Sequence, residues 1–173
     1  MSYVDFKNTT DAAIAAGSRH GISPSSNANV GNFTMDHVTF SNVGTAFEHG
    51  SGAGTVVTMS DFEVNDASDA CFNFAEDSVV TLTDGTMDDC NSGSNPTGGA
   101  IMNVAGSTGG SLVLENIDIT DSMVNLIDVD LETVWISNLT ATTTSTQSGI
   151  VLAAEGAGAD SSLYVYYMDA SGY

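Results

Sequence analysis

The sequence predicts an all-β chain that winds as a parallel β-helix of about six coils with three strands per coil. A ten-residue pattern recurs: two alternating apolar residues, a polar kink, two more alternating apolar residues and then, in most copies, Asn or Asp. Complete copies occupy 33–42, 57–66, 80–89, 112–121 and 134–143, a half copy occupies 4–8, and a weaker copy occupies 163–172. Copies from 33 onward start 22 to 32 residues apart, which is a solenoid period.

Each copy predicts two short strands, one on either side of the kink, because alternation with a period of two buries one face of a strand. In the copy at 33–42, the inward residues are Phe33, Met35, Val38 and Phe40. Full burial of one such side chain is worth about 1.5–3 kcal/mol. The stacked coils are therefore expected to share one long, narrow core.

A third apolar segment follows each copy and predicts the third strand of the coil. These segments occupy 12–15, 46–49, 70–74, 100–104, 125–129 and 149–152. Residues 1–173 are expected to form a single β-helix domain, since 42% of them are hydrophobic, which suffices for one core. The half copy at the start and the incomplete copy at the end predict a fragment of a longer solenoid.

Two columns of polar residues recur at fixed places in the pattern. The kink column contains His37, Asp61, Asp84, Asn116 and Asn138, and the end column contains Asn8, Asn42, Asp66, Asp89, Asp121 and Thr143. Asn and Asp tolerate the left-handed conformation and bond to nearby backbone groups. We expect both columns to be structural corners.

These repeats resemble the right-handed parallel β-helix superfamily, which includes pectate lyases, polygalacturonases, phage tailspikes and many surface proteins. The resemblance covers nearly all of residues 3–173 and implies a right-handed solenoid, but such scaffolds carry many functions. Lyase chemistry in this superfamily requires Ca²⁺ and a basic residue that removes a proton. The basic residues here are Lys7 and Arg19, and neither has a basic neighbour in sequence, which argues against a lyase.

The chain has 22 acidic and 2 basic residues, a net charge of −20. This charge opposes binding to nucleic acids and anionic membranes, and it disfavours acidic polysaccharides. Coils about 4.8 Å apart would bring carboxylates of one column together, such as Asp61 with Asp84. Two explanations stay open: Ca²⁺ or a saline setting relieves the repulsion, or the acidic residues keep a β-rich surface soluble. No other cofactor is expected.

The two cysteines, Cys71 and Cys90, fall in successive coils. They are expected either to form a disulfide, as in many secreted proteins, or to remain small buried thiols. No signal peptide or membrane span is apparent in the chain.

Fragments of the sequence resemble polygalacturonases, although the order differs and no Arg-Ile-Lys segment is present. The matching fragments are Asn8-Thr-Thr-Asp11, His49-Gly50 and Asp88-Asp89. Inverting hydrolysis requires two carboxyl groups about 6.5–9.5 Å apart. In this interpretation Asp66, Asp88 and Asp89 are the candidate catalytic residues, with Glu63 as another outward carboxylate.

The second position of each copy faces solvent and holds Trp135 and Tyr164 in the last two copies. Flat aromatic faces suit the apolar faces of neutral sugars, so these are the candidate ligand-binding residues. Alternatively, the segment 153–162 folds over the two rings.

The favoured function is a non-catalytic β-helix module of an extracellular or cell-surface protein, with a structural, adhesive or glycan-contacting role. The alternative is a fragment of a carbohydrate-active enzyme, a polygalacturonase-like glycoside hydrolase that uses outward Asp residues. The expected partners are polysaccharides, or neighbouring coils or subunits at the ends of the solenoid. Neither a nucleic-acid partner nor a membrane span is expected.

Overall fold

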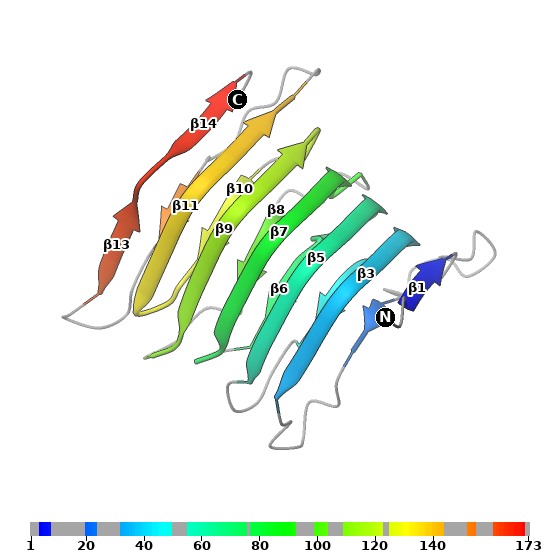
Figure 1. The fold of residues 1–173 in the computed structure, drawn as a ribbon, viewed down its shortest axis with the longest axis horizontal. Coiled ribbons are helices and arrows are strands. Elements are labelled where there is room, and N and C mark those ends of the chain that lie inside the picture. The colour runs from blue at the N-terminus through cyan, green and yellow to red at the C-terminus, as the bar shows by residue number, and fades with distance from the viewer. Residues whose placement is uncertain are drawn as a thin grey trace.

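The computed structural model describes residues 4–7, 20–23, 32–49, 55–75, 77–92, 99–103, 109–122, 125–143, 152–154 and 161–171. Within these ranges every regular element is a β-strand, and the strands form two parallel sheets (Figure 1). An all-β chain with parallel sheets is therefore confirmed. The same residues contain no helix with the length and apolar character needed to cross a membrane.

The larger sheet has the strand order β1-β3-β5-β7-β9-β11-β13, and β14 pairs with β11 beside β13. Its strands are β1 (Val4–Lys7), β3 (Phe33–Val43), β5 (Val56–Ala67), β7 (Val79–Cys90), β9 (Ser111–Thr120), β11 (Thr133–Thr142), β13 (Ser162–Val165) and β14 (Met168–Ser171). The order runs open from one edge to the other, so this sheet does not close on itself.

The smaller sheet has the strand order β12-β10-β8-β6-β4-β2 and is also open. Its strands are β2 (His20–Ile22), β4 (Thr45–Glu48), β6 (Phe72–Phe74), β8 (Gly99–Asn103), β10 (Asn125–Val129) and β12 (Leu152–Ala154). From β1 to β13, successive strands alternate between the two sheets.

The register of the larger sheet places equivalent residues of the repeats side by side. Phe33 pairs with Val57, Val57 with Val80, and Val80 with Leu112. The line continues through Val134 to Leu163. The predicted alignment of the repeats is thus confirmed in every strand from β3 to β13.

The core lies between the two sheets and is formed by the alternate inward residues of both. The rings of Phe62 on β5 and Phe72 on β6 meet edge to face, with centroids 5.4 Å apart. Phe33 on β3 and Phe47 on β4 meet in the same way at 5.5 Å. Edge-to-face pairs of this kind add to the free energy gained by burying the rings.

The prediction of three strands per coil is wrong for the five complete copies, because the two halves of each form one long strand, whereas the weaker copy at 163–172 forms two strands, β13 and β14. The kink residue is left-handed in every long strand, at His37, Asp61, Asp84, Asn116 and Asn138. Between β3 and β5, pairing stops at Asp36 with Ser60 and resumes at Val38 with Phe62, so the ladder passes over the kink pair. One left-handed residue therefore bends the strand without ending it, as in a β-bulge.

The end column is left-handed as well, at Asn42, Asp66, Asp89 and Asp121. Asn8 lies outside the described residues. Thr143 is not among the residues with positive φ, which agrees with the steric cost of that conformation for a β-branched side chain. The structural interpretation of the Asn and Asp columns is confirmed.

A disulfide joins Cys71 and Cys90, whose Cα atoms are 5.3 Å apart. Both side chains are fully buried. Cys90 ends β7 beside Ala67 of β5, and Cys71 precedes β6. The bond therefore links the passage between the two sheets to the end of the next long strand.

The two cysteines are 19 positions apart, so the disulfide closes a loop of that length in the unfolded chain. We expect the Cys71→Ala, Cys90→Ala double variant to lose about 3 kcal/mol of unfolding free energy, because it no longer restricts the unfolded chain. Urea unfolding with and without reductant measures the effect. Reductant should bring the wild type to the midpoint of the variant and leave the variant unchanged; equal midpoints without reductant would contradict the prediction.

Gly85 on β7 is expected to be intolerant of a side chain because the ring of its cross-strand partner Phe62 fills the space. A Cβ at Gly85 would overlap with Cζ of the Phe62 ring. Gly85→Ala should therefore cost about 1–3 kcal/mol through overpacking. A double-mutant cycle with Phe62→Leu, followed by thermal unfolding, should show a favourable coupling. Additive effects of the two substitutions would refute the proposed contact.

Candidate functional site

The outward face of β11 and β13 carries adjacent aromatic residues because of the parallel register. Trp135 pairs with Tyr164 on β13 and with Val113 on β9. Tyr166 follows β13, and its backbone amide donates to the carbonyl of Ile136 at 2.9 Å. Regular pairing therefore brings together three rings from two segments of the chain.

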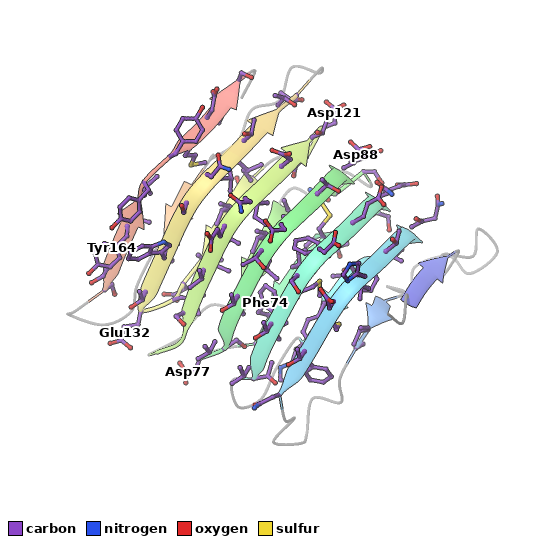
Figure 2. All side chains as sticks on the ribbon, viewed as in Figure 1. Phe74, Asp77, Asp88, Asp121, Glu132 and Tyr164 are labelled. Atoms are coloured by element: carbon purple, nitrogen blue, oxygen red, sulfur yellow. A yellow bond between two sulfur atoms is a disulfide. The ribbon has the colours of Figure 1, made fainter. Side chains whose placement is uncertain are left out.

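We call Trp135, Tyr164 and Tyr166 the aromatic cluster. The ring centroids of Trp135 and Tyr164 are 5.4 Å apart with an interplanar angle of 39°. Those of Trp135 and Tyr166 are 4.8 Å apart at 35°. The exposed fractions are 36% for Trp135, 46% for Tyr164 and 69% for Tyr166. The three rings therefore form a tilted aromatic surface that is accessible to solvent. Figure 2 labels Tyr164.

The neighbouring apolar residues of β13 are exposed too, although they occupy inward columns. Leu163 pairs with the buried Val134, and Val165 pairs with the buried Ile136. Their exposed fractions are 50% and 45%. Among the described strands β13 is the last in the order of the larger sheet, and side chains on both of its faces are exposed.

In the alternative interpretation, segment 153–162 covers the two rings. Residues 155–160 of this segment lie outside the described residues. The exposed fractions of Trp135 and Tyr164 nevertheless leave both rings accessible. The structure therefore places the two candidate ligand-binding residues together, in contact and at the surface.

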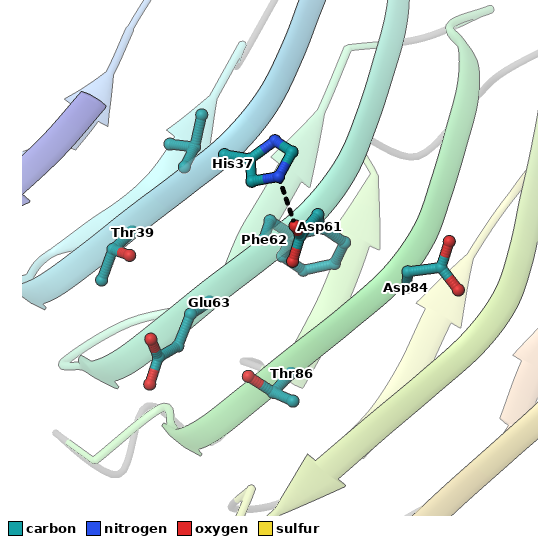
Figure 3. A pocket seen from close by; sticks show the side chains of 8 residues that line it. His37, Thr39, Asp61, Phe62, Glu63, Asp84 and Thr86 are labelled. Atoms are coloured by element: carbon teal, nitrogen blue, oxygen red, sulfur yellow. Dashed lines mark ion pairs between the residues drawn. The ribbon is translucent and has the colours of Figure 1, made fainter. Parts of the chain in front are cut away.

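A second feature is an open depression of about 370 Å³ on the outward face of β3, β5 and β7 (Figure 3). It is lined by His37, Val38, Thr39, Asp61, Phe62, Glu63, Asp84 and Thr86. Sequence reasoning missed it, although the register aligns Thr39, Glu63 and Thr86 in one outward column. That column of hydroxyl and carboxyl groups in the repeats could have indicated a polar surface at this place.

Hydrogen bonds within the kink column hold the polar residues of the depression in place. His37 Nε2 lies 2.8 Å from Asp61 Oδ2, and His37 Nδ1 lies 2.8 Å from Asp36 Oδ2. The imidazole therefore bridges the carboxylates of Asp36 on β3 and Asp61 on β5. The Ser60 hydroxyl donates to Asp36 at 2.8 Å and, together with His37, lowers the pKa of Asp36. In this geometry His37 holds two carboxylates of adjacent strands in place.

The other end of the kink column is a chain of side-chain hydrogen bonds. Asn138 Nδ2 donates to Asn116 Oδ1 at 2.9 Å, and Asn116 Nδ2 donates to Asp84 Oδ1 at 2.8 Å. Each amide therefore links two adjacent strands of the larger sheet, which supports a structural role for the column.

The alternative catalytic residues lie at the ends of β5 and β7, and none of them lines the depression. Asp88 is exposed near the end of β7, and Figure 2 shows it at the same end of the sheet as Asp121. Asp66 and Asp89 are left-handed corners, and Ser92 Oγ donates to Asp66 at 2.9 Å. Partial burial and the carboxylates of Asp66, Asp88 and Asp121 raise the pKa of Asp89.

Of the other fragments that resemble polygalacturonases, the structure describes His49 alone, and His49 does not face these carboxylates. His49 is fully buried, its amide donates to the carbonyl of Asn73 at 2.9 Å, and burial lowers its pKa, which favours the neutral ring. Neither ring nitrogen has a hydrogen-bond partner in the described part of the chain. A buried His49 cannot serve an outward site, while Asn8, Asp11 and Gly50 lie outside the described residues.

Within the described ranges, no three His, Cys, Asp or Glu side chains are grouped as ligands of a metal ion. The expected Ca²⁺ stays a prediction, and unfolding at low salt with and without chelator tests it.

No family model, no curated protein and no solved structure matches this chain. The likeness to pectate-lyase-like solenoids stays a prediction, and function has to be inferred from the site itself.

We expect Asp89→Asn to stabilise the protein at neutral pH. The raised pKa of Asp89 means that its stabilising contribution is complete below the ordinary value of 3.8 and is lost as pH rises through the folded pKa. Asn tolerates the φ of 54° at this corner. The gain should stay below about 1 kcal/mol, since solvent screens the charges.

Thermal unfolding at low salt measures this gain, which should shrink at high salt and vanish in acid. Asp118→Asn, at an exposed position on β9, removes the same charge away from the end column and is the matched control. Equal effects of the two substitutions would show that local repulsion at Asp89 is not the cause.

Proposed function

We propose that the chain is a module of a right-handed parallel β-helix of the pectate-lyase-like kind, with about six coils. Two observations support this proposal: strands alternate between two parallel sheets, and equivalent residues of successive repeats pair in register. In such a coil the left-handed kink of each long strand takes the place of one of the three corners, so that two sheets enclose the core.

The proposed function is non-catalytic contact with a glycan through the aromatic cluster, in an extracellular or cell-surface protein. The carrying observation is that Trp135, Tyr164 and Tyr166 are in ring contact yet exposed. Aromatic faces bury the C–H faces of sugars at low entropic cost, because the rings have few rotatable bonds and are held by the sheet. A rigid strand pair also fixes the spacing of the rings before the ligand arrives.

Two further observations fit an extracellular setting. The buried disulfide between Cys71 and Cys90 is typical of proteins that fold in an oxidising compartment. A net charge of −20 disfavours nucleic acids and other polyanions as partners. The proposed partners are therefore polysaccharides, with neighbouring coils or subunits as further candidates at the exposed edge of β13.

The rival function is glycoside hydrolysis by Asp66, Asp88 and Asp89. Their grouping at one end of the larger sheet and the raised pKa of Asp89 are compatible with an acid and a base of different strength. Asp66 and Asp89, however, are left-handed corners. Asp is suited to that conformation, which explains its presence at both positions without a catalytic role.

Trp135→Ala should weaken glycan binding by at least about tenfold, as expected for a central aromatic contact. A glycan array identifies ligands, and titration calorimetry measures their affinities. Trp135→Phe keeps an aromatic ring at the same position and is the matched control, with a smaller loss expected. Tyr164→Ala should weaken binding as well.

Release of reducing sugar is measured on the same glycans to separate the two functions. Turnover that Asp88→Asn or Asp89→Asn abolishes would establish the enzyme and refute the proposal. An array without any saturable ligand would refute glycan contact and leave a structural role.

A further inference from the structure

Two acidic residues lie on or next to the strands that carry and adjoin the aromatic cluster. Glu115 on β9 is exposed and pairs with Ser137, two positions beyond Trp135 on β11, so it lies diagonally across from Trp135 on the outward face. Glu132 is exposed and immediately precedes β11, and its carbonyl accepts the amide of Ser162 at 2.8 Å. Figure 2 labels Glu132 and Tyr164 in the region where β11 and β13 begin.

A third carboxylate strengthens the negative potential near Glu132. A Cβ placed on Gly109 would lie 3.6 Å from Oδ1 of Asp77 and 3.9 Å from Oε2 of Glu132. Asp77 and Glu132 therefore both lie near Gly109, along the edge of the sheet where Figure 2 labels both. Negative charges on one edge raise the local concentration of cations.

The charge of the protein disfavours an anionic ligand at this corner. Of the Lys and Arg residues, the described ranges include Lys7 alone, and its strand β1 is at the opposite end of the strand order from β13. The chain has 22 acidic and 2 basic residues. An anionic sugar on the aromatic cluster would therefore be repelled by Glu115, Glu132 and the net charge of −20.

We propose that the aromatic cluster, with Glu115 and Glu132, binds oligosaccharides that carry protonated amino groups, of the glucosamine type. The inference rests on the proposed glycan contact and adds the charge of the ligand. An ammonium group is attracted to the face of a Trp or Tyr ring and is paired by the flanking carboxylates. A neutral sugar uses the rings alone, and a uronate is repelled.

Trp135 is the single tryptophan of the chain, so its fluorescence reports on this site. The full chain is titrated with three oligosaccharides of equal length: glucosamine with free amines, its fully N-acetylated form, and galacturonate. The buffer is mildly acidic and of low ionic strength, so that the amines and the carboxylates are charged. We expect the amine form to bind about 3- to 10-fold tighter than the acetylated form, the range of one or two exposed ion pairs, and galacturonate not to bind.

Substitutions separate specific recognition from general attraction to an acidic protein. In the Glu115→Gln, Glu132→Gln double variant, the preference for the amine form should disappear while binding of the acetylated form is unchanged. Asp88→Asn, Asp121→Asn removes the same charge far from the rings and should keep the preference. Raising the salt concentration should reduce the preference in the wild type.

Equal affinity for the amine and acetylated forms, both lost in Trp135→Ala as measured by calorimetry, would overturn this inference and leave the proposed glycan contact intact. Absence of binding by all three oligosaccharides would overturn this inference, while the array decides glycan contact in general. Preference for galacturonate would overturn it too. A lysine peptide with the same charge as the amine oligosaccharide is a further control. If it binds as tightly as that oligosaccharide and its binding is lost in Trp135→Ala, the site recognises the amine rather than the saccharide, and the proposed ligand class is refuted.

Discussion

Parallel pairing between equivalent residues of successive repeats is the constraint on which the rest of this structure depends. From Phe33 through Val57, Val80 and Leu112 to Val134, each inward residue lies beside its counterpart on the next strand. A slip by one residue would turn every inward side chain to solvent, since the side-chain period of a strand is two. Burial of one face therefore fixes the register, and the register places every other group.

The same register has an electrostatic consequence for the outward face. Residues of one column lie about 4.8 Å from their neighbours, so an acidic column repels itself. In the kink column the repulsion is relieved where His37 bonds to Asp61 and where Asn116 and Asn138 link to Asp84. In the end column Asp89 faces three carboxylates, and its raised pKa records the remaining repulsion. His and Asn residues beside the Asp residues of a column thus allow left-handed corners to lie next to one another with less repulsion.

Function is proposed on β11 and β13, the strand pair that carries the exposed rings. The aromatic cluster is held by backbone pairing of β11 with β13 and is open to solvent. Leu163 and Val165 on β13 are exposed as well. A surface of this kind combines a rigid scaffold with accessible apolar groups, which ligand recognition requires. The carboxylates around it then select the charge of the ligand.

The sequence by itself determined the period of the repeats, the inward and outward faces, the left-handed corners and the pairing of Trp135 with Tyr164. These features are local or periodic: alternation reports burial, Asn and Asp report corners, and equal positions in successive copies become neighbours. Only the tertiary structure decided that each kink bends one continuous strand, that Cys71 bonds to Cys90, and that His49 is buried. Each of these depends on what lies across the sheet or between the two sheets, and such contacts between distant segments leave no periodic mark in the chain.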